Sequence, residues 1–158
     1  MPWAIFIRDA GFMAATLGAW RAADAWQGAS PGLGWDLIAI LAGVLLSLVW
    51  GYAIHEWGHL AAAWASGARV YPSSNPASVK LFAYVKEENS DRQFFWLTAG
   101  GLGALWLQVV GFATLFPWRT PGGLAAILFA TGGAIFTTAK EAPIGLRLPS
   151  SGLTAHRS

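Results

Sequence analysis

The sequence predicts an all-α membrane protein with about four transmembrane helices and a small cytoplasmic β-hairpin between the second and the third. Hydrophobic residues make up 55% of the chain and charged residues only 11%, far from the averages of soluble domains. Ten Trp and nineteen Gly point the same way, because Trp favours bilayer interfaces and Gly lets membrane helices pack closely. The apolar residues also fall into long runs, which turn regions and one polar stretch separate.

The length of 158 residues predicts a single integral membrane domain over residues 1–158. The net charge of +2 is small and the basic residues are dispersed, so nucleic acid is not an expected partner. The chain contains no Cys, which excludes disulfides and thiolate ligands. Any metal ion must therefore be held by His, Glu or Asp.

The first apolar run, residues 10–20, is short and has charged residues on both sides. Extended back to Trp3 it is just long enough to cross a bilayer, so residues 1–24 are predicted to form an extra N-terminal membrane helix. An interfacial helix is one alternative, and a signal peptide is another, because residues 23–25 resemble a cleavage site. Gly, Pro and Ser in residues 27–35 predict a turn.

The second apolar run, residues 37–66, predicts one unbroken helix that contains the His-Glu-x-x-His motif His55-Glu-Trp-Gly-His59. On a helix the two His side chains lie one turn apart on the same face, as two imidazoles need in order to bind one metal ion. Glu56 lies beside them, where it can accept a proton from a metal-bound water. Such groups are costly in hydrocarbon, so the motif predicts a metal site; buried, hydrogen-bonded histidines are the alternative.

Gly67 is predicted to end this helix, and residues 68–92 form the one clearly polar stretch. Within it, residues 79–86 have a strand-favouring composition, and Val70-Tyr71 can pair with them as a β-hairpin. Residues 86–92 are predicted to be a charged surface loop whose carboxylates are solvated rather than catalytic.

Residues 95–116 and 122–139 are two further apolar runs, which predict the third and fourth membrane helices. Small residues near the start of the first of these runs favour close helix packing. Pro143 is predicted to end the last helix, and residues 146–158 to form a flexible tail.

Lys and Arg residues are distributed unevenly over the two sides of a four-span arrangement. Eight of the ten lie on one side, together with both termini, the hairpin and the end of the second helix that carries the motif. The positive-inside rule places that side in the cytoplasm. The predicted location is the bacterial inner (cytoplasmic) membrane, with both termini cytoplasmic.

A catalytic zinc usually has three protein ligands and one open position for water. Glu141 is our first candidate for the third ligand, because it is expected at the same depth in the membrane as His55 and His59. A Glu that only marks the water boundary beside Lys140 is an equally supported interpretation. His156 is the second candidate, although a flexible tail makes a poorly organised ligand.

The pattern as a whole resembles the site-2 protease family of intramembrane zinc metalloproteases. His55-Glu-Trp-Gly-His59 is similar to the family's first motif, including the Gly before the second His. Ala99-Gly-Gly-Leu-Gly-Ala104 is similar to its Ala-Gly-Pro-Leu-Ala-Asn motif. Glu141-Ala-Pro-Ile-Gly145 stands where the family has an Asp-Gly that supplies the third ligand. The resemblance covers residues 37–145.

This sequence departs from the family pattern at three positions. Gly101 replaces the Pro and Ala104 replaces the Asn, so a polar group that helps to hold the substrate or the intermediate is missing. Gln108 lies one turn further along the same helix and is a candidate to take its place. Glu141 replaces the Asp and is longer by one methylene. These departures bear on proteolysis more than on the fold or the metal.

The resemblance implies zinc (Zn2+) as the cofactor, held by the two His and a carboxylate, with Glu56 as the base that passes the water proton to the leaving amine. The implied substrates are membrane-spanning proteins cut near the cytoplasmic boundary after local unwinding, because a helix hides its carbonyls in its own hydrogen bonds. The predicted strand can hold such a segment by edge pairing. The substrate contacts predicted in this way are Val79, Leu81, Ala83, Gly100, Gly101 and Gln108.

Three functions stay open on the sequence. The first is a small intramembrane zinc metalloprotease. The second is a catalytically inactive, protease-like subunit with a structural or assembly role in a larger membrane protein complex, which the missing Asn and the altered Asp favour. The third is a metal-dependent membrane hydrolase that acts on another substrate. The intact Glu56 favours a catalyst, because a scaffold needs no general base.

Overall fold

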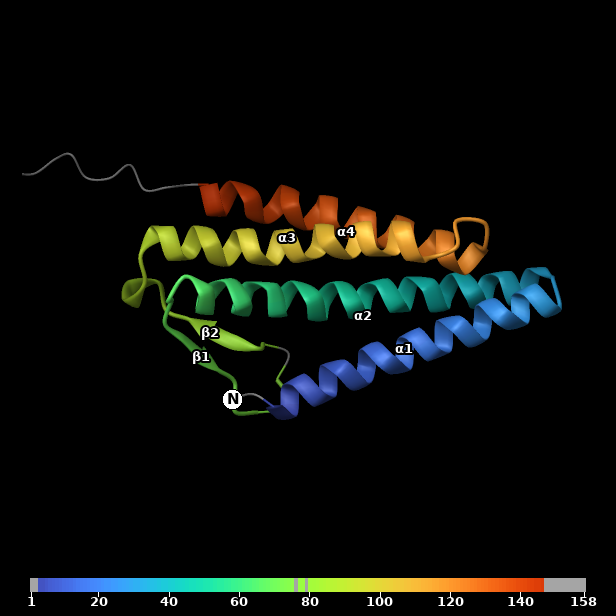
Figure 1. Ribbon diagram of the computed structural model, residues 1–158, viewed down its shortest axis with the longest axis horizontal. Helices are drawn as coiled ribbons and strands as arrows, with labels where there is room; N and C mark the ends of the chain where they lie inside the picture. Colours follow the sequence, from blue (N-terminus) through green and yellow to red (C-terminus); the bar gives the residue numbers. More distant parts are fainter. Residues whose placement is uncertain (1–2, 76, 79, 147–158) are drawn as a thin grey trace, which may run out of the picture.

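A computed structural model of the chain describes residues 3–75, 77–78 and 80–146 (Figure 1). The chain is mostly helical, and a small antiparallel sheet lies between the second and third long helices. The elements are α1 (Trp3–Ala29), α2 (Leu33–Ala65), β1 (Val70–Pro72), β2 (Phe82–Tyr84), the 3-10 turn η1 (Lys86–Glu88), α3 (Asp91–Leu115) and α4 (Pro121–Leu146).

Within the described residues, three helices are long and apolar enough to cross a membrane, namely α2, α3 and α4. Helix α1 is also long, at 27 residues, but charged side chains lie along it: Arg8, Asp9, Arg21 and Asp24. The structure therefore has three helices of the length and composition predicted for membrane spans. A fourth span through α1 stays a prediction.

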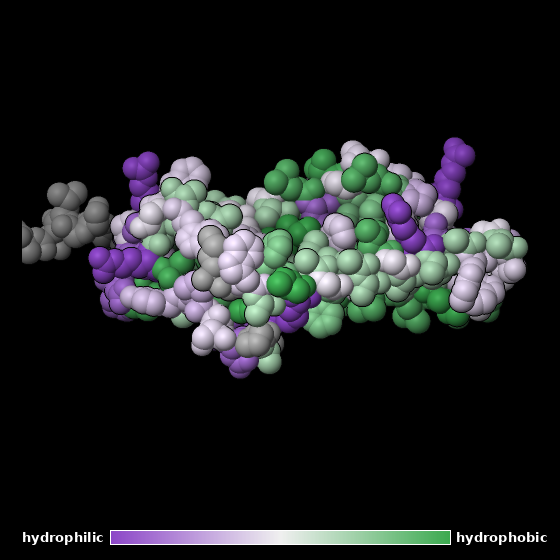
Figure 2. All heavy atoms as spheres, turned by 60° about the horizontal axis from the view of Figure 1, so that its bottom comes forward, coloured by the Kyte–Doolittle hydropathy of each residue, from purple (hydrophilic) through white to green (hydrophobic). Residues whose placement is uncertain are grey.

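Helices α2, α3 and α4 pack against one another, whereas α1 packs mainly along α2 (Figure 1). The first half of α1 diverges from α2, and the small sheet fills the space between them (Figure 1). The start of α1, the sheet and the end of α4 lie at one end of the molecule, which we call the hairpin end. Figure 2 shows hydrophobic side chains over the middle of one face, with hydrophilic ones gathered toward both ends.

Glycines allow the helix backbones to touch at the centre of the bundle. An ideal Cβ at Gly58 of α2 would lie only 2.6 Å from the carbonyl oxygen of Gly100 in α3. Helices α2 and α4 meet in the same way at Gly43 and Gly122. The close packing predicted for the start of α3 is therefore observed, and it fixes α3 and α4 against the face of α2 that carries the two His.

The turn between the first two helices and the charged loop before α3 are both shorter than predicted, because the helices beside them are longer. Helix α1 continues to Ala29 and α2 begins at Leu33, so the turn predicted over residues 27–35 narrows to residues 30–32. Helix α3 begins at Asp91 because Ser90 and Gln93 form a capping box, in which each side chain bonds the other residue's backbone N–H.

The prediction that Pro143 ends the last helix is wrong, because α4 continues through it to Leu146. A proline removes one backbone donor but lets a helix go on when packing holds the following turn. That packing is visible at Gly145, where an ideal Cβ would lie 2.8 Å from the Thr98 side chain of α3. The rest of the predicted tail, including His156, lies outside the described residues.

The predicted hairpin forms, with β1 and β2 antiparallel and Tyr71 opposite Ala83, although β2 is confined to Phe82–Tyr84. Gly67 ends α2 in the left-handed conformation, with a φ of 69°. The predicted charged loop is partly ordered: Tyr71 donates a hydrogen bond of 2.6 Å to Glu88, which raises the pKa of the Tyr71 hydroxyl. That carboxylate is therefore bonded rather than only solvated.

Candidate metal centre

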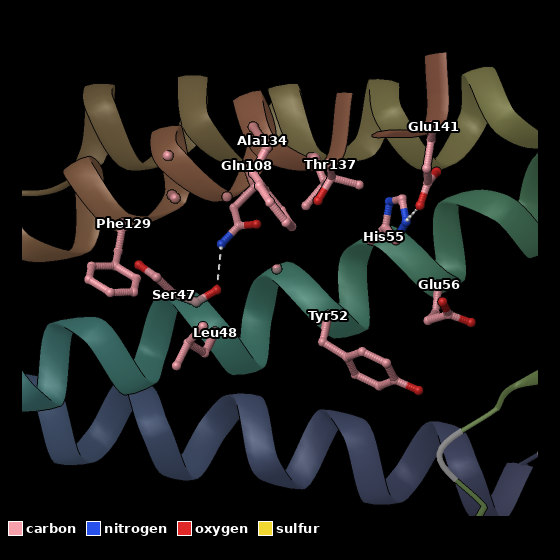
Figure 3. A pocket seen from close by; sticks show the side chains of 16 residues that line it. Ser47, Leu48, Tyr52, His55, Glu56, Gln108, Phe129, Ala134, Thr137 and Glu141 are labelled. Carbon is pink, nitrogen blue, oxygen red and sulfur yellow. Dashed lines mark hydrogen bonds and ion pairs between the residues drawn. The ribbon is translucent and has the colours of Figure 1, made fainter. Parts of the chain in front are cut away.

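Three side chains from two helices meet near the hairpin end of the bundle: His55 and His59 of α2 and Glu141 of α4 (Figure 3). Nε2 of His55 lies 3.1 Å from Oε1 of Glu141 and 3.0 Å from Nε2 of His59. Nε2 of His59 lies 3.5 Å from Oε2 of Glu141. Among the described residues these are the His, Asp and Glu side chains that come together in a group able to hold a metal ion.

A backbone contact fixes the proton position on His59. Its Nδ1 donates a hydrogen bond of 2.7 Å to the carbonyl oxygen of Leu97 in α3. The neutral imidazole then carries its lone pair on Nε2, which faces His55 and Glu141. Nε2 of His59 therefore faces Nε2 of His55 and the Glu141 carboxylate, an arrangement that could hold a cation. Outer contacts of this kind orient histidine ligands in metal sites.

The centre is shielded but not closed. The His55 and His59 side chains are each 12% exposed and that of Glu141 is 32% exposed. The helix spacing explains why the group forms, since residues 55 and 59 share one face of α2 and α4 packs against that face. Glu141 therefore lies beside His55 and His59 in the bundle, as a third ligand requires, and its role as a ligand stays a prediction.

Gly101 of α3 makes room for the His59 ring. An ideal Cβ at this position would collide with Cε1, Nδ1 and Nε2 of His59. The ring therefore lies against the backbone of α3, where it reaches the Leu97 carbonyl. The absence of a side chain at position 101 is part of how the centre is built.

We expect Gly101→Ala to destabilise the protein by about 1–3 kcal/mol, because the added methyl overpacks a buried contact that the ring cannot leave without losing its hydrogen bond. Gly103→Ala is the matched control, since it lies on the same helix with nothing within 4 Å of its Cβ position. Denaturant unfolding of the purified protein in detergent measures both. Equal stabilities for the two variants would contradict this assignment of Gly101.

A cavity of about 500 Å³ leads from the metal centre toward the middle of the bundle (Figure 3). It opens between α2 and α4, with α3 as its floor, and its size is in the usual range for ligand sites. Most of its lining is apolar or glycine. The polar and charged side chains that line it are Ser47, Tyr52, His55, Glu56, Gln108, Thr137 and Glu141.

Glu56 lines the same cavity as His55 and Glu141. Its side chain lies on the other side of the α2 ribbon from that pair and points away from Glu141 (Figure 3). Glu56 therefore lines the cavity without belonging to the ligand group, and because its carboxylate does not face the ligands, its role as the general base stays a prediction.

The other residues predicted to contact a substrate lie in different surroundings. Gln108 lines the cavity, whereas Gly100 is in the backbone contact with α2 and Gly101 lies beneath His59. Leu81 packs its side chain in a buried cluster with Ile5 and Leu60, so a substrate would reach only its backbone. Ala83 is exposed on β2, and Val79 lies outside the described residues.

Sequence reasoning missed the carbonyl of Leu97 and the cavity residues Ser47, Tyr52 and Thr137. A backbone carbonyl leaves no signal in a sequence. Ser47 did leave one, because it precedes His55 by eight residues, or two turns of the same helix face. Thr137 likewise precedes Glu141 by one turn. Polar residues in register with the metal ligands therefore mark the cavity wall.

No family model, no curated protein and no solved structure matches this chain. The resemblance to site-2 proteases stays a prediction, which depends on three short motifs. In the structure the three motifs meet at one place. Nε2 of His59 lies 3.5 Å from Oε2 of Glu141. Residues 99–104 supply Gly100, which lies against Gly58, and Gly101, which lies against the His59 ring.

Proposed function

We propose that this protein is an intramembrane zinc metalloprotease that hydrolyses peptide bonds of membrane-spanning substrates near the cytoplasmic boundary. The observation that supports it best is the convergence of His55, His59 and Glu141 at the wall of a cavity that Glu56 also lines. The three apolar helices support the membrane setting. The bacterial inner membrane and the cytoplasmic termini remain part of the proposal, on the positive-inside count.

The donor atoms fit a tetrahedral zinc ion. Bonds of about 2.0–2.1 Å to His and carboxylate ligands in a tetrahedron separate the donor atoms by roughly 3.3 Å. The three separations here, 3.0, 3.1 and 3.5 Å, surround that value. Two imidazoles and one carboxylate also form a recognised ligand set of catalytic zinc sites, in which a fourth position stays open.

Each residue then has a defined task. His55, His59 and Glu141 would hold the ion, and the Leu97 carbonyl keeps the His59 ring in the required tautomer. Bound zinc supplies an acidic water and polarises the peptide carbonyl. Glu56 accepts the water proton at its carboxylate and donates it to the leaving amine. The apolar cavity walls limit the access of bulk water to the peptide bond.

Metal removal tests this function directly. We expect the purified protein to contain one zinc ion and to cleave single-span membrane proteins, with cleavage lost on chelation and restored by zinc. Metal analysis by mass spectrometry and gel analysis of the products measure the two properties. Cleavage that persists after zinc has been removed would contradict the proposal.

A second candidate, the catalytically inactive subunit, is favoured by one observation. Ala104, which stands where the resembling family has Asn, lies in the contact between α3 and α2, 2.6 Å from an ideal Cβ at Gly58. The Ala104 methyl group has no polar atom, so residue 104 cannot hydrogen-bond a substrate as the family's Asn would. Stoichiometric zinc without cleavage of any membrane-spanning substrate would favour the inactive subunit over the protease.

A further inference from the structure

A groove of about 750 Å³ lies between α1 and α3, which pack on different sides of α2 (Figure 1). Its described lining includes none of the three candidate metal ligands. Among the described residues, the charged side chains that line it are Arg21 and Asp24, which lie three residues apart and so near one another on α1. Most of the other lining side chains are apolar, among them Leu17, Trp50, Ile54, Leu107, Phe112 and Phe116.

The groove is about as long as one leaflet of a bilayer is deep. On α3 it runs from Ala104 to Phe116, which is about 18 Å at 1.5 Å per residue. Half of a hydrocarbon core of roughly 30 Å is about 15 Å. The charged residues lie at its outer end, because they follow Trp20, whose ring stacks on that of Phe116 at the end of α3. An acyl chain in the groove would therefore span one leaflet, with its headgroup at Arg21 and Asp24.

The two charged side chains at this end do not neutralise each other. In the part of the chain that the structure describes, neither side chain has a hydrogen-bond or ion-pair partner. The Asp24 side chain is half-buried and its Oδ1 is buried, so its charge is costly unless a cation lies beside the open part of the carboxylate. Arg21 is exposed, and its guanidinium is suited to bind a phosphate group.

The chemistry of the groove indicates its occupant. The apolar walls match an acyl chain, Arg21 matches a phosphate, and Asp24 matches a cation close to that phosphate. A phospholipid with an ethanolamine headgroup carries all three groups, and its primary ammonium can donate hydrogen bonds to a carboxylate. A choline headgroup has no N–H to donate, and a glycerol headgroup has no cation. A membrane-spanning helix of another protein has no phosphate for Arg21.

We infer that this groove binds a zwitterionic phospholipid with a primary ammonium group, with its phosphate on Arg21, its ammonium on Asp24 and one acyl chain between α1 and α3. Trp26 and Trp118 are exposed near the same end, as side chains at the level of lipid headgroups often are. The lipid would join α1 to α3, which pack on α2 rather than on each other. The inference does not depend on the proposed proteolysis.

Native mass spectrometry of the full chain in detergent tests this inference. The protein is titrated with phosphatidylethanolamine, phosphatidylcholine or phosphatidylglycerol, all with the same acyl chains, and the Kd of the first bound lipid is measured. We expect phosphatidylethanolamine to bind about three- to tenfold more tightly than phosphatidylcholine, the usual effect of one hydrogen bond. Phosphatidylglycerol should also bind more weakly than phosphatidylethanolamine, because it places no cation beside Asp24.

Two charge variants test the headgroup contacts. Asp24→Asn should abolish the preference for phosphatidylethanolamine and strengthen the binding of phosphatidylglycerol, because it removes a negative charge. Its matched control is Asp36→Asn, at an acidic residue in the first turn of α2 outside the groove. Arg21→Gln should weaken all three lipids by a similar factor, because all three carry the phosphate. Its control is Arg119→Gln, at an exposed residue just after α3.

A third variant tests the position of the acyl chain. Gly111 lines the groove with nothing within 4 Å of its ideal Cβ, so a larger side chain there occupies the groove instead of displacing the fold. We expect Gly111→Leu to weaken the binding of all three lipids. Gly103→Leu is the matched control, because Gly103 has the same open surroundings on α3 but lies outside the groove. Circular dichroism checks that both variants keep their helices.

The outcomes are decisive in both directions. Equal affinities of the wild-type protein for phosphatidylethanolamine and phosphatidylcholine would overturn the inference, as would a preference that survives Asp24→Asn. Equal lipid binding by Gly111→Leu and Gly103→Leu would overturn the place of the acyl chain. Removal of zinc should leave every lipid affinity unchanged, so a failure of the proposed proteolysis and a failure of the lipid site are observed separately.

Discussion

Glu141→Ala is expected to lower the zinc affinity of the protein by at least about 100-fold. The loss of an outer contact to a metal ligand already costs 10–100-fold, and a direct ligand contributes more. Glu141 also supplies the negative charge of the centre, because the two imidazoles bind zinc as neutral groups. Competition between the purified protein and a fluorescent chelator measures the affinity.

A second variant separates loss of the ligand from loss of the fold. Glu141→Gln keeps the length and shape of the side chain but removes the charge, so we expect a folded protein with weakened zinc binding. Glu87→Ala is the control for removal of an acidic residue, since Glu87 is exposed on η1, far along the chain from the ligands. Full zinc occupancy in both variants at position 141 would refute Glu141 as a ligand.

The sequence was sufficient to predict the long helices and the meeting of His55, His59 and Glu141, for a physical reason. The length of each apolar run predicts a helix long enough to cross a membrane, and the four-residue spacing of His55 and His59 places both on one helix face. Glu141 could be predicted because it lies near the same end of its helix as His55 and His59 do of theirs, and packed helices place residues of equal depth side by side. In each case a residue's place along one helix already determines its place in the bundle.

Other features depend on contacts that a sequence does not record. Pro143 did not end α4, because Gly145 packs on α3 and stabilises the last turn. The tautomer of His59 depends on a carbonyl, which every residue possesses. Leu81 looked available to a substrate from the alternation of its strand, but the side of the sheet that faces α2 became the buried side.

Glu56→Gln is expected to lower the rate of peptide hydrolysis about 100- to 10,000-fold while leaving the zinc content unchanged. The carboxamide cannot accept the water proton, whereas its size matches that of the carboxylate. Zinc binding should persist because Glu56 lies outside the ligand group and points away from Glu141 (Figure 3). Single-turnover cleavage of a membrane-spanning substrate, together with metal analysis of the same sample, measures both quantities.

Measuring both the cleavage rate and the zinc content of Glu56→Gln separates a catalytic role of Glu56 from a structural one. A structural role for Glu56 would lower zinc content and stability together with the rate, whereas a general base affects the rate alone. Glu87→Gln makes the same chemical change at an exposed position and should keep the wild-type rate. Unchanged hydrolysis in Glu56→Gln would remove Glu56 from the mechanism and leave the cluster of His55, His59 and Glu141 as a metal site without a base. That result would shift the balance toward the inactive subunit, in which the same three ligands hold α2 and α4 together.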